Sequence, residues 1–158
     1  MSVSHQPASY HTLTPYLIIK NAAAAIDFYR AVFDATEVMR MTGPDGTIAH
    51  AEVKIGDSII MLSEENPAWG TRSPQSLGGS PVGMCLYFQD VDARFAAAVA
   101  AGAKVVRPVA DQFYGDRSGT VTDPFGHQWT LATHVEDVAP EEMMKRFDQV
   151  MGAAQPAA

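Results

Sequence analysis

Two side chains with acid–base chemistry stand two residues apart in the stretch His50-Ala51-Glu52. In a β-strand, residues at this spacing project from the same face, so the imidazole and the carboxylate can point into one cavity. A carboxylate that orients an imidazole makes it a general base. The alternative is a polar row facing solvent, with Lys54 as its third member, and the pattern leaves both open.

A second candidate group is the run Tyr114-Gly115-Asp116-Arg117, which precedes a predicted hairpin. Arg117 could grip an anionic substrate group, and Tyr114 could stack on the substrate or hydrogen-bond to it. The alternative interpretation is an Asp-Arg ion pair that holds the loop in shape.

The strand of that hairpin carries further candidates. Its alternation predicts one face with Gln128, Thr130, Ala132 and His134 and an opposite face with Trp129, Leu131 and Thr133. We expect Thr130 and His134 to face a cavity. His134 is followed by Glu136 and Asp137, so a metal site at the strand end is an alternative. His127, just after the turn glycine, is expected to be exposed or to hydrogen-bond within the turn.

Three aromatic residues could line a pocket or close its lid: Tyr16, Trp69 and Tyr87. Aromatic residues in strands belong to the core more often than to a site. The only cysteine, Cys85, lies in an apolar run and is predicted to be a buried structural thiol.

Composition excludes several classes of function. The chain has 158 residues, 47% of them hydrophobic, which is enough for a real core. The formal charge of −7 argues against nucleic acid and anionic membrane surfaces as partners. No apolar run approaches the roughly 20 residues that span a bilayer, and the polar N-terminus lacks a signal-like apolar segment, so we expect a cytoplasmic protein.

The order of elements predicts a repeated β-α-β-β-β unit. In the first half, Asn21 is the predicted N-cap of a helix, and the expected strands are Thr12–Lys20, Thr36–Met41, Thr47–Ile55 and Ser58–Ser63. In the second half, Asp90 is the predicted cap, and the expected strands are Val82–Gln89, Lys104–Arg107, Gly115–Asp123 and His127–His134.

Sequence landmarks support duplication, because Lys20-Asn21 matches Gln89-Asp90 and Val38-Met39-Arg40 matches Val105-Val106-Arg107 in the same order. The fold class is therefore α+β, with two such modules. We expect a mobile N-terminus (1–11), a first module (12–64), and a linker or flap rich in Pro, Gly and Ser (65–81). A second module (82–138), a C-terminal helix (139–151) and a disordered tail (152–158) are expected to follow.

Together these features resemble the vicinal oxygen chelate superfamily, which includes glyoxalase I, bleomycin and fosfomycin resistance proteins and extradiol dioxygenases, and more closely its PhnB-like branch. The motifs that carry the resemblance are Thr14-Pro15-Tyr16-Leu17, Ala25-Ile26-Asp27-Phe28-Tyr29, Pro44-Asp45-Gly46, His50-Ala51-Glu52, Gly56-Asp57-Ser58, Ser73-Pro74, Gly78-Gly79, Tyr114-Gly115-Asp116-Arg117 and Asp123-Pro124-Phe125-Gly126-His127. They identify a fold and no single reaction.

The resemblance implies a curled mixed sheet around a cavity, with a homodimer as the usual assembly. In metal-dependent members, His and Glu from the first and last strand of each module bind a divalent ion. Carried over by register, those positions hold Thr14, Met61, Gly83 and Thr130. None of the four is a ligand that such an ion favours, so we expect no metal there and no other cofactor.

Three functions follow as hypotheses. The first is a metal-free protein that binds a small organic molecule in a cavity. The second is a lyase, isomerase or dioxygenase-like enzyme that uses an unusual metal site near His50, Glu52 and His134, or proton transfer by His50 and Glu52 without metal. The third is an interaction role built on a dimer and the Met-rich C-terminal helix. The sequence does not decide between binding and catalysis, nor whether the cavity lies within one chain or between two.

Overall fold

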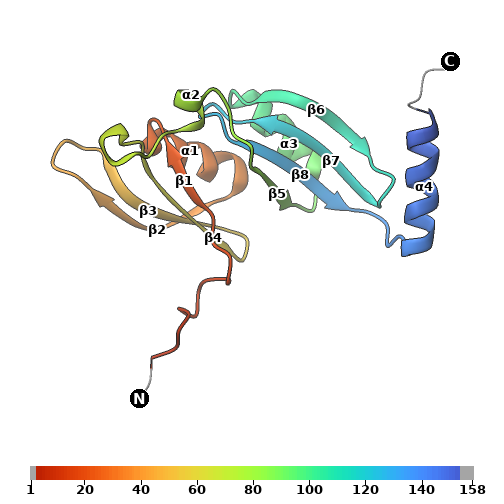
Figure 1. Cartoon of the computed structure of the whole chain (residues 1–158), viewed down its shortest axis with the longest axis horizontal. Helices are drawn as coiled ribbons and strands as arrows, with labels where there is room; N and C mark the ends of the chain where they lie inside the picture. The colour runs from red at the N-terminus through yellow and green to blue at the C-terminus, as the bar shows by residue number, and fades with distance from the viewer. Residues whose placement is uncertain (1–2, 154–158) are drawn as a thin grey trace. The chain divides into compact units, whose positions relative to one another are not determined.

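The computed structural model describes residues 3–153 and confirms the α+β class with two β-α-β-β-β modules (Figure 1). The elements of the first part of the chain are β1 (Tyr16–Ile19), α1 (Ala22–Phe33), β2 (Thr36–Thr42), β3 (Ile48–Ile55), β4 (Ser58–Glu64), the 3-10 helix η1 (Pro67–Trp69) and α2 (Pro74–Leu77). Those of the second part are β5 (Gly83–Tyr87), α3 (Val91–Ala100), β6 (Lys104–Asp111), β7 (Asp116–Thr122), β8 (Gln128–His134) and α4 (Pro140–Ala153).

The predicted repeat is present in the sheet topology. The first sheet has the strand order β1-β4-β3-β2 and the second has the matching order β5-β8-β7-β6. In each, the outer strand β1 or β5 runs parallel to its neighbour, and the other pairs are antiparallel. The strands thus form two four-stranded sheets, and curling around a shared cavity stays a prediction.

Two compact units make up the chain. The first runs to Val82 and also takes in the turn Asp123–His127, and the second comprises Gly83–Thr122 and the chain from Gln128 onward. The turn belongs with the first unit because the Asp123 carboxylate accepts a hydrogen bond from the buried Tyr29 hydroxyl at 2.9 Å. His127 is accordingly 5% exposed, which leaves its predicted hydrogen-bonding role and removes the exposed alternative.

One face of each sheet packs against its helix. In β8, Trp129 and Leu131 are fully buried, and the Thr133 hydroxyl accepts the Val91 backbone N–H at the start of α3. In β3, Ala51 and Val53 are likewise fully buried. The alternate residues therefore lie on the opposite face of each sheet, which we call the open face.

Several element boundaries differ from the predictions. β1 is shorter than the predicted strand, and β6 is longer. The segment predicted to be a linker or flap contains η1 and α2. The Asn66 side chain accepts the backbone N–H of Ala68 at the start of η1, and the Ser73 side chain accepts that of Ser76 at the start of α2. The predicted disordered tail begins inside α4, and its remainder, 154–158, lies outside the described residues.

The N-cap of α1 is also different. Asn21 occupies the cap position, but its side chain makes no cap hydrogen bond. The Glu64 carboxylate, at the end of β4, accepts the backbone N–H groups of Asn21 at 2.6 Å and Ala22 at 2.9 Å. A negative charge at the N-terminus of the helix also interacts favourably with the helix dipole.

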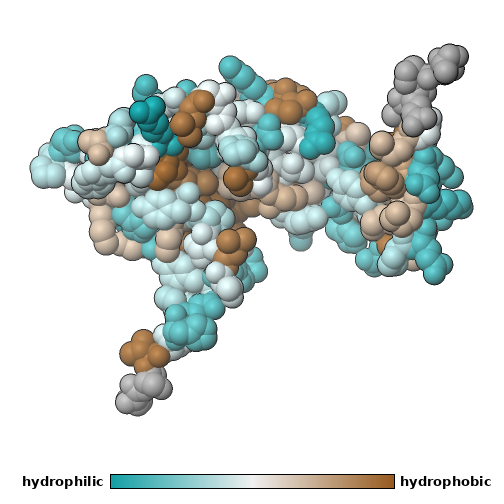
Figure 2. Space-filling view, in the orientation of Figure 1, coloured by the Kyte–Doolittle hydropathy of each residue, from teal (hydrophilic) through white to brown (hydrophobic). Residues whose placement is uncertain are grey.

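α4 is amphipathic, as predicted. Apolar side chains gather along one side of the helix and hydrophilic ones along the other (Figure 2). The exposed apolar residues of this stripe are Met144, Phe147, Val150 and Met151. No described helix is both long and apolar enough to cross a membrane.

Candidate functional site

His50 and Glu52 lie together on the open face of the first sheet. The distance from His50 Nε2 to Glu52 Oε1 is 3.3 Å, and the Tyr16 hydroxyl lies 3.0 Å from His50 Nδ1. With the proton assigned to Nε2, the imidazole donates to the carboxylate and accepts from the phenol. A carboxylate, an imidazole and a hydroxyl in this order can draw a proton away from the hydroxyl.

Glu52 is 6% exposed, so it is not part of a solvent-facing row, whereas Lys54 is exposed. The hydrogen bond to Glu52, followed by desolvation and the charge of the carboxylate, raises the pKa of the Tyr10 phenol. The buried carboxylate is therefore held by an imidazole on one side and a phenol on the other. The contacts that join Glu52, His50 and Tyr16 form a chain that we call the first-module relay.

A groove of about 610 Å³ adjoins the relay at Tyr16. Its floor comes from the first sheet, and one wall comes from the segment between β4 and α2. Trp69 lies on that wall and is 83% exposed. The residues that line the groove are Tyr16, Ile18, Asp45, Thr47, Ile48, Ala49, Ser63, Glu64, Glu65, Asn66, Pro67, Trp69 and Thr71.

Glu65 holds the wall of the groove in place. Its carboxylate accepts the backbone N–H of Ser73 at 2.9 Å and the hydroxyls of Ser73 and Ser76 at 2.8 and 3.0 Å. These bonds, the backbone N–H first, lower the pKa of Glu65 to about 2. Trp69 therefore belongs to a segment that these hydrogen bonds hold in place and that contains two short helices, η1 and α2.

On the second sheet, the predicted residues Tyr87 and His134 meet at a carboxylate that the sequence did not single out as their partner. Asp116, 6% exposed, accepts the Tyr87 hydroxyl at 2.8 Å and lies 2.7 Å from His134 Nδ1. The hydrogen bond to Asp116 raises the pKa of Tyr87 to about 12. Asp137, 3.0 Å from His134 Nε2, and then Asp116 raise the pKa of His134.

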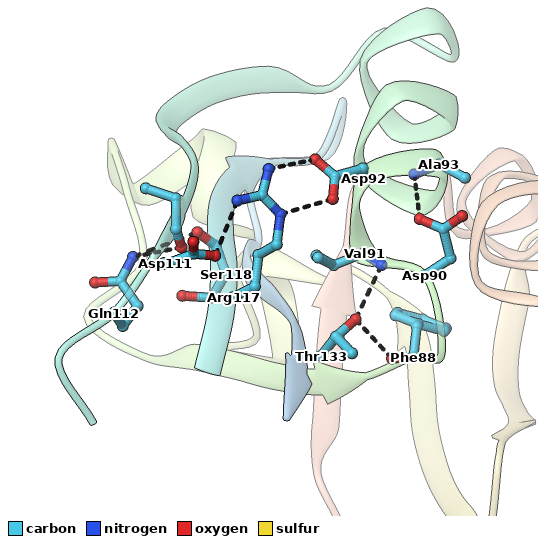
Figure 3. A network of polar contacts seen from close by, with 11 residues as sticks. Phe88, Asp90, Val91, Asp92, Ala93, Asp111, Gln112, Arg117, Ser118 and Thr133 are labelled. Carbon is cyan, nitrogen blue, oxygen red and sulfur yellow. Dashed lines mark hydrogen bonds and ion pairs between the residues drawn. The ribbon is translucent and has the colours of Figure 1, made fainter. Parts of the chain in front are cut away.

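Arg117 lies on the helix side of β7 and not on the open face. Its guanidinium binds the Asp92 carboxylate through Nε at 2.7 Å and Nη2 at 2.8 Å, and Asp111 through Nη1 at 2.9 Å (Figure 3). Two carboxylates, one on α3 and one at the end of β6, therefore already occupy the guanidinium.

The arginine on the open face of the second sheet is Arg107, which sequence reasoning missed as a site residue. Val105 pairs with Val121, but the next pair is Arg107 with Thr120, so Val106 is the extra residue of a β-bulge. The bulge turns Arg107 to the face of Thr120, where its Nη2 donates to the Thr120 hydroxyl at 3.2 Å. The only indication of this bulge in the sequence is the pair of adjacent apolar residues Val105-Val106, which breaks the alternation of the strand.

Thr130 and Tyr114 lie near Arg107. The Thr130 and Thr120 hydroxyls are 3.1 Å apart, and Tyr114 lines a recess together with Arg107 and Thr120. Cys85, predicted to be buried, is exposed because β5 is an edge strand whose open face has no covering layer in its own unit.

The positions that the resemblance assigns to metal ligands do not fit a divalent ion. Met61 pairs with Tyr16 across β1 and β4, and Thr130 pairs with Cys85 across β5 and β8. In residues 3–153, no cluster of three or more His, Cys, Asp or Glu is arranged to hold a metal. At the alternative site near His134, Glu136 is engaged by Arg146 at 2.8 Å.

Comparisons with known proteins agree with this fold. The sequence profile of the Glyoxalase/Bleomycin resistance protein/Dioxygenase superfamily matches residues 10–131. An uncharacterised protein of Mycobacterium bovis is 45% identical over 146 residues, covering 90% of this chain and 93% of its own length. The crystal structure of TioX from Micromonospora sp. matches 82% of this chain and 100% of its own at 25% identity, with a TM-score of 0.60. The structure of a PhnB protein from Bacillus cereus matches 78% of this chain and 99% of its own at 19% identity, with a TM-score of 0.58, which supports the fold alone.

Proposed function

Because the chain belongs to the Glyoxalase/Bleomycin resistance protein/Dioxygenase superfamily, we propose that it binds a small organic molecule in the groove of its first module, without a metal at the superfamily's usual positions. The observation that carries this proposal is the groove itself, about 610 Å³ in volume, with the exposed ring of Trp69 on its wall. A cavity of this size matches a drug-sized ligand. An aromatic or amphipathic metabolite or antibiotic is the class that fits best.

The lining supports this class of ligand. Ile18, Ile48 and Pro67 offer apolar contact, and the indole of Trp69 offers a face for stacking. The Tyr16 hydroxyl supplies a polar anchor at the floor. A cleft that combines apolar contact surface with polar groups selects ligands by shape and by hydrogen bonds.

Fluorescence tests the proposal, because the chain has two tryptophans and one of them, Trp129, is fully buried. We would titrate the protein with bleomycin and with anilinonaphthalene sulfonate while following iodide quenching of the tryptophan emission. Binding in the groove should protect Trp69 from iodide, and the Trp69→Phe variant should show no such protection. Binding of either compound with unchanged quenching of Trp69 would place it elsewhere and defeat the proposal.

The first-module relay favours a second candidate function, a metal-free lyase or isomerase that moves a proton on the bound molecule. Tyr16 touches both the groove and His50, so the phenol oxygen can exchange a proton with a ligand while His50 takes up the phenol proton. Glu52 then stabilises the imidazolium that forms, through the 3.3 Å contact to Nε2. Solvent deuterium incorporation into a ligand found by the fluorescence titration tests this, and loss of exchange in His50→Ala with retained binding is the expected result.

We also propose that the chain forms a homodimer, as the resemblance to the superfamily implies. Sedimentation equilibrium of the full chain should give twice the mass of 17.0 kDa.

A further inference from the structure

We propose that the open face of the second sheet binds the carboxylate group of a small organic acid, held by the Arg107 guanidinium and the Thr130 hydroxyl, with the Thr120 hydroxyl linking these two side chains. Its lining residues all belong to the second unit, whereas those of the groove belong to the first, and neither proposal depends on the other. Arg107 lines a small recess, its positive charge has no carboxylate partner there among residues 3–153, and most of its N–H donors are unused.

The recess is small and polar. Its volume is about 30 Å³, and its lining consists of Arg107, Gln112, Tyr114, Ser118, Gly119 and Thr120. A space of this size holds a group of one or two water volumes, so it fits a carboxylate head while the rest of the ligand lies outside. Ser118 and Thr120, at 5% and 3% exposed, give it a desolvated polar floor.

The charge of Arg107 is not balanced within the recess. Among the described residues its one hydrogen bond goes to the neutral Thr120 hydroxyl, whereas Arg117 and Arg146 are each engaged by two carboxylates. A guanidinium presents five N–H donors in a planar fork, and most of the donors of Arg107 remain available. A carboxylate is the planar anion that such a fork binds through two parallel hydrogen bonds.

The threonine pair supplies a further donor. Thr120 Oγ1 accepts from Arg107, so its own hydroxyl proton can point to Thr130 Oγ1 at 3.1 Å. The Thr130 hydroxyl proton is then free to donate outward, next to the arginine. Asp116, two positions before Ser118 on the same face, adds negative potential that opposes a dianion. A singly charged carboxylate therefore suits the recess better than phosphate.

The test follows backbone amide resonances by NMR while the full chain is titrated with benzoate, inorganic phosphate or neutral benzyl alcohol at constant ionic strength. We expect saturable shifts of Gly119, Thr120 and Thr130 with benzoate and none with benzyl alcohol. Arg107→Gln should weaken benzoate binding by roughly tenfold or more, because a charge-assisted bidentate contact is lost. Arg30→Gln, on the exposed side of α1, removes the same charge and should leave binding unchanged.

Three results would overturn the proposal: benzoate shifts that persist in Arg107→Gln, phosphate binding tighter than benzoate binding, or no shift at these three amides. Arg107→Lys keeps the charge but loses the fork, and intermediate affinity is expected from it. A well-dispersed spectrum of each variant shows that the protein is folded. Quenching of Trp69 should not respond to benzoate at this site, which keeps failure here apart from failure of the first-module proposal.

Discussion

Truncation of Trp69 should weaken ligand binding strongly and leave folding nearly unchanged. A tryptophan offers about 250 Å² of surface at most, and the 83% exposure of Trp69 leaves roughly 200 Å² of it open to solvent. A ligand that stacks on one side of the ring would cover about half of that, on the order of 100 Å². At ~25 cal/mol per Å², the covered area contributes about 2.5 kcal/mol, which corresponds to a loss of affinity of roughly 70-fold in Trp69→Ala.

The matched control for this change is Leu77→Ala. Leu77 lies in α2 on the same segment, is 65% exposed and does not line the groove. Both variants remove exposed apolar surface, so both should change the free energy of unfolding by no more than about 0.5 kcal/mol. Calorimetric titration measures the affinity for whichever compound protects Trp69 from iodide, and urea unfolding measures the stability.

The reasoning would be refuted if Trp69→Ala bound the ligand within about twofold of the parent protein, since the area estimate would then have no stacking contact behind it. It would equally fail if Leu77→Ala lost as much affinity as Trp69→Ala. Trp69→Phe should fall between parent and alanine variant, because a smaller ring keeps part of the contact area.

Three further predictions concern single side chains. Glu52→Ala leaves His50 Nε2 without its acceptor and should lower the free energy of unfolding by about 1–3 kcal/mol in urea titrations, whereas Glu52→Gln, which keeps an acceptor, should lose less. Glu64→Ala removes the cap of α1 and should cost about 1 kcal/mol by the same measurement, with Glu64→Gln closer to the parent. His134 has a raised pKa, so its contribution to stability is complete below its unfolded value of about 6.5 and is lost as pH rises through the higher folded value. The melting-temperature difference between parent and His134→Gln should therefore shrink from about pH 5.5 to pH 9; a difference that grows with pH would contradict it.

The fold could be predicted from local sequence patterns because the alternation of apolar and polar residues is clearest in strands with one buried face. The alternation in β8 assigned Trp129 and Leu131 to the core face and Thr130 and His134 to the open face, and the helix side of that strand is fully buried at the first two. Side-chain period fixes which face a residue occupies once the strand is recognised. Gly102, which follows the C-cap of α3, has a φ of 101°, in the left-handed region that favours glycine after a helix.

Contacts between residues distant in sequence could not be obtained in the same way. The cap of α1 comes from Glu64, on a strand three elements later, and local sequence pointed instead to Asn21. Tyr87 and His134 share Asp116 as their hydrogen-bond partner, but the sequence indicated Asp116 only as the neighbour of Arg117. Sequence spacing places residues on a face, but the pairing of strands decides which of them touch.

At Arg107 the landmark match between the two repeats is out of register by one residue. The landmark match of Val38-Met39-Arg40 with Val105-Val106-Arg107 sets Arg107 against Arg40. Strand pairing instead makes Met39 the counterpart of Arg107, because Met39 pairs with Glu52 in the first sheet as Arg107 pairs with Thr120 in the second. Both modules have a bulge at this point of the outer hairpin, with Val38 and Val106 as the extra residues. After each bulge, Met39 or Arg107 lies on the open face of its sheet.

This correspondence explains why two modules of one topology carry opposite chemistry. The first places a buried carboxylate, Glu52, beside an apolar Met39, and the second places a cationic Arg107 beside a neutral Thr120. An anionic group brought to the first open face meets a charge of its own sign, whereas on the second it meets an unbalanced guanidinium. Selection by charge thus differs between the faces although their backbones match, so neutral or cationic groups are expected to suit the first module and carboxylates the second.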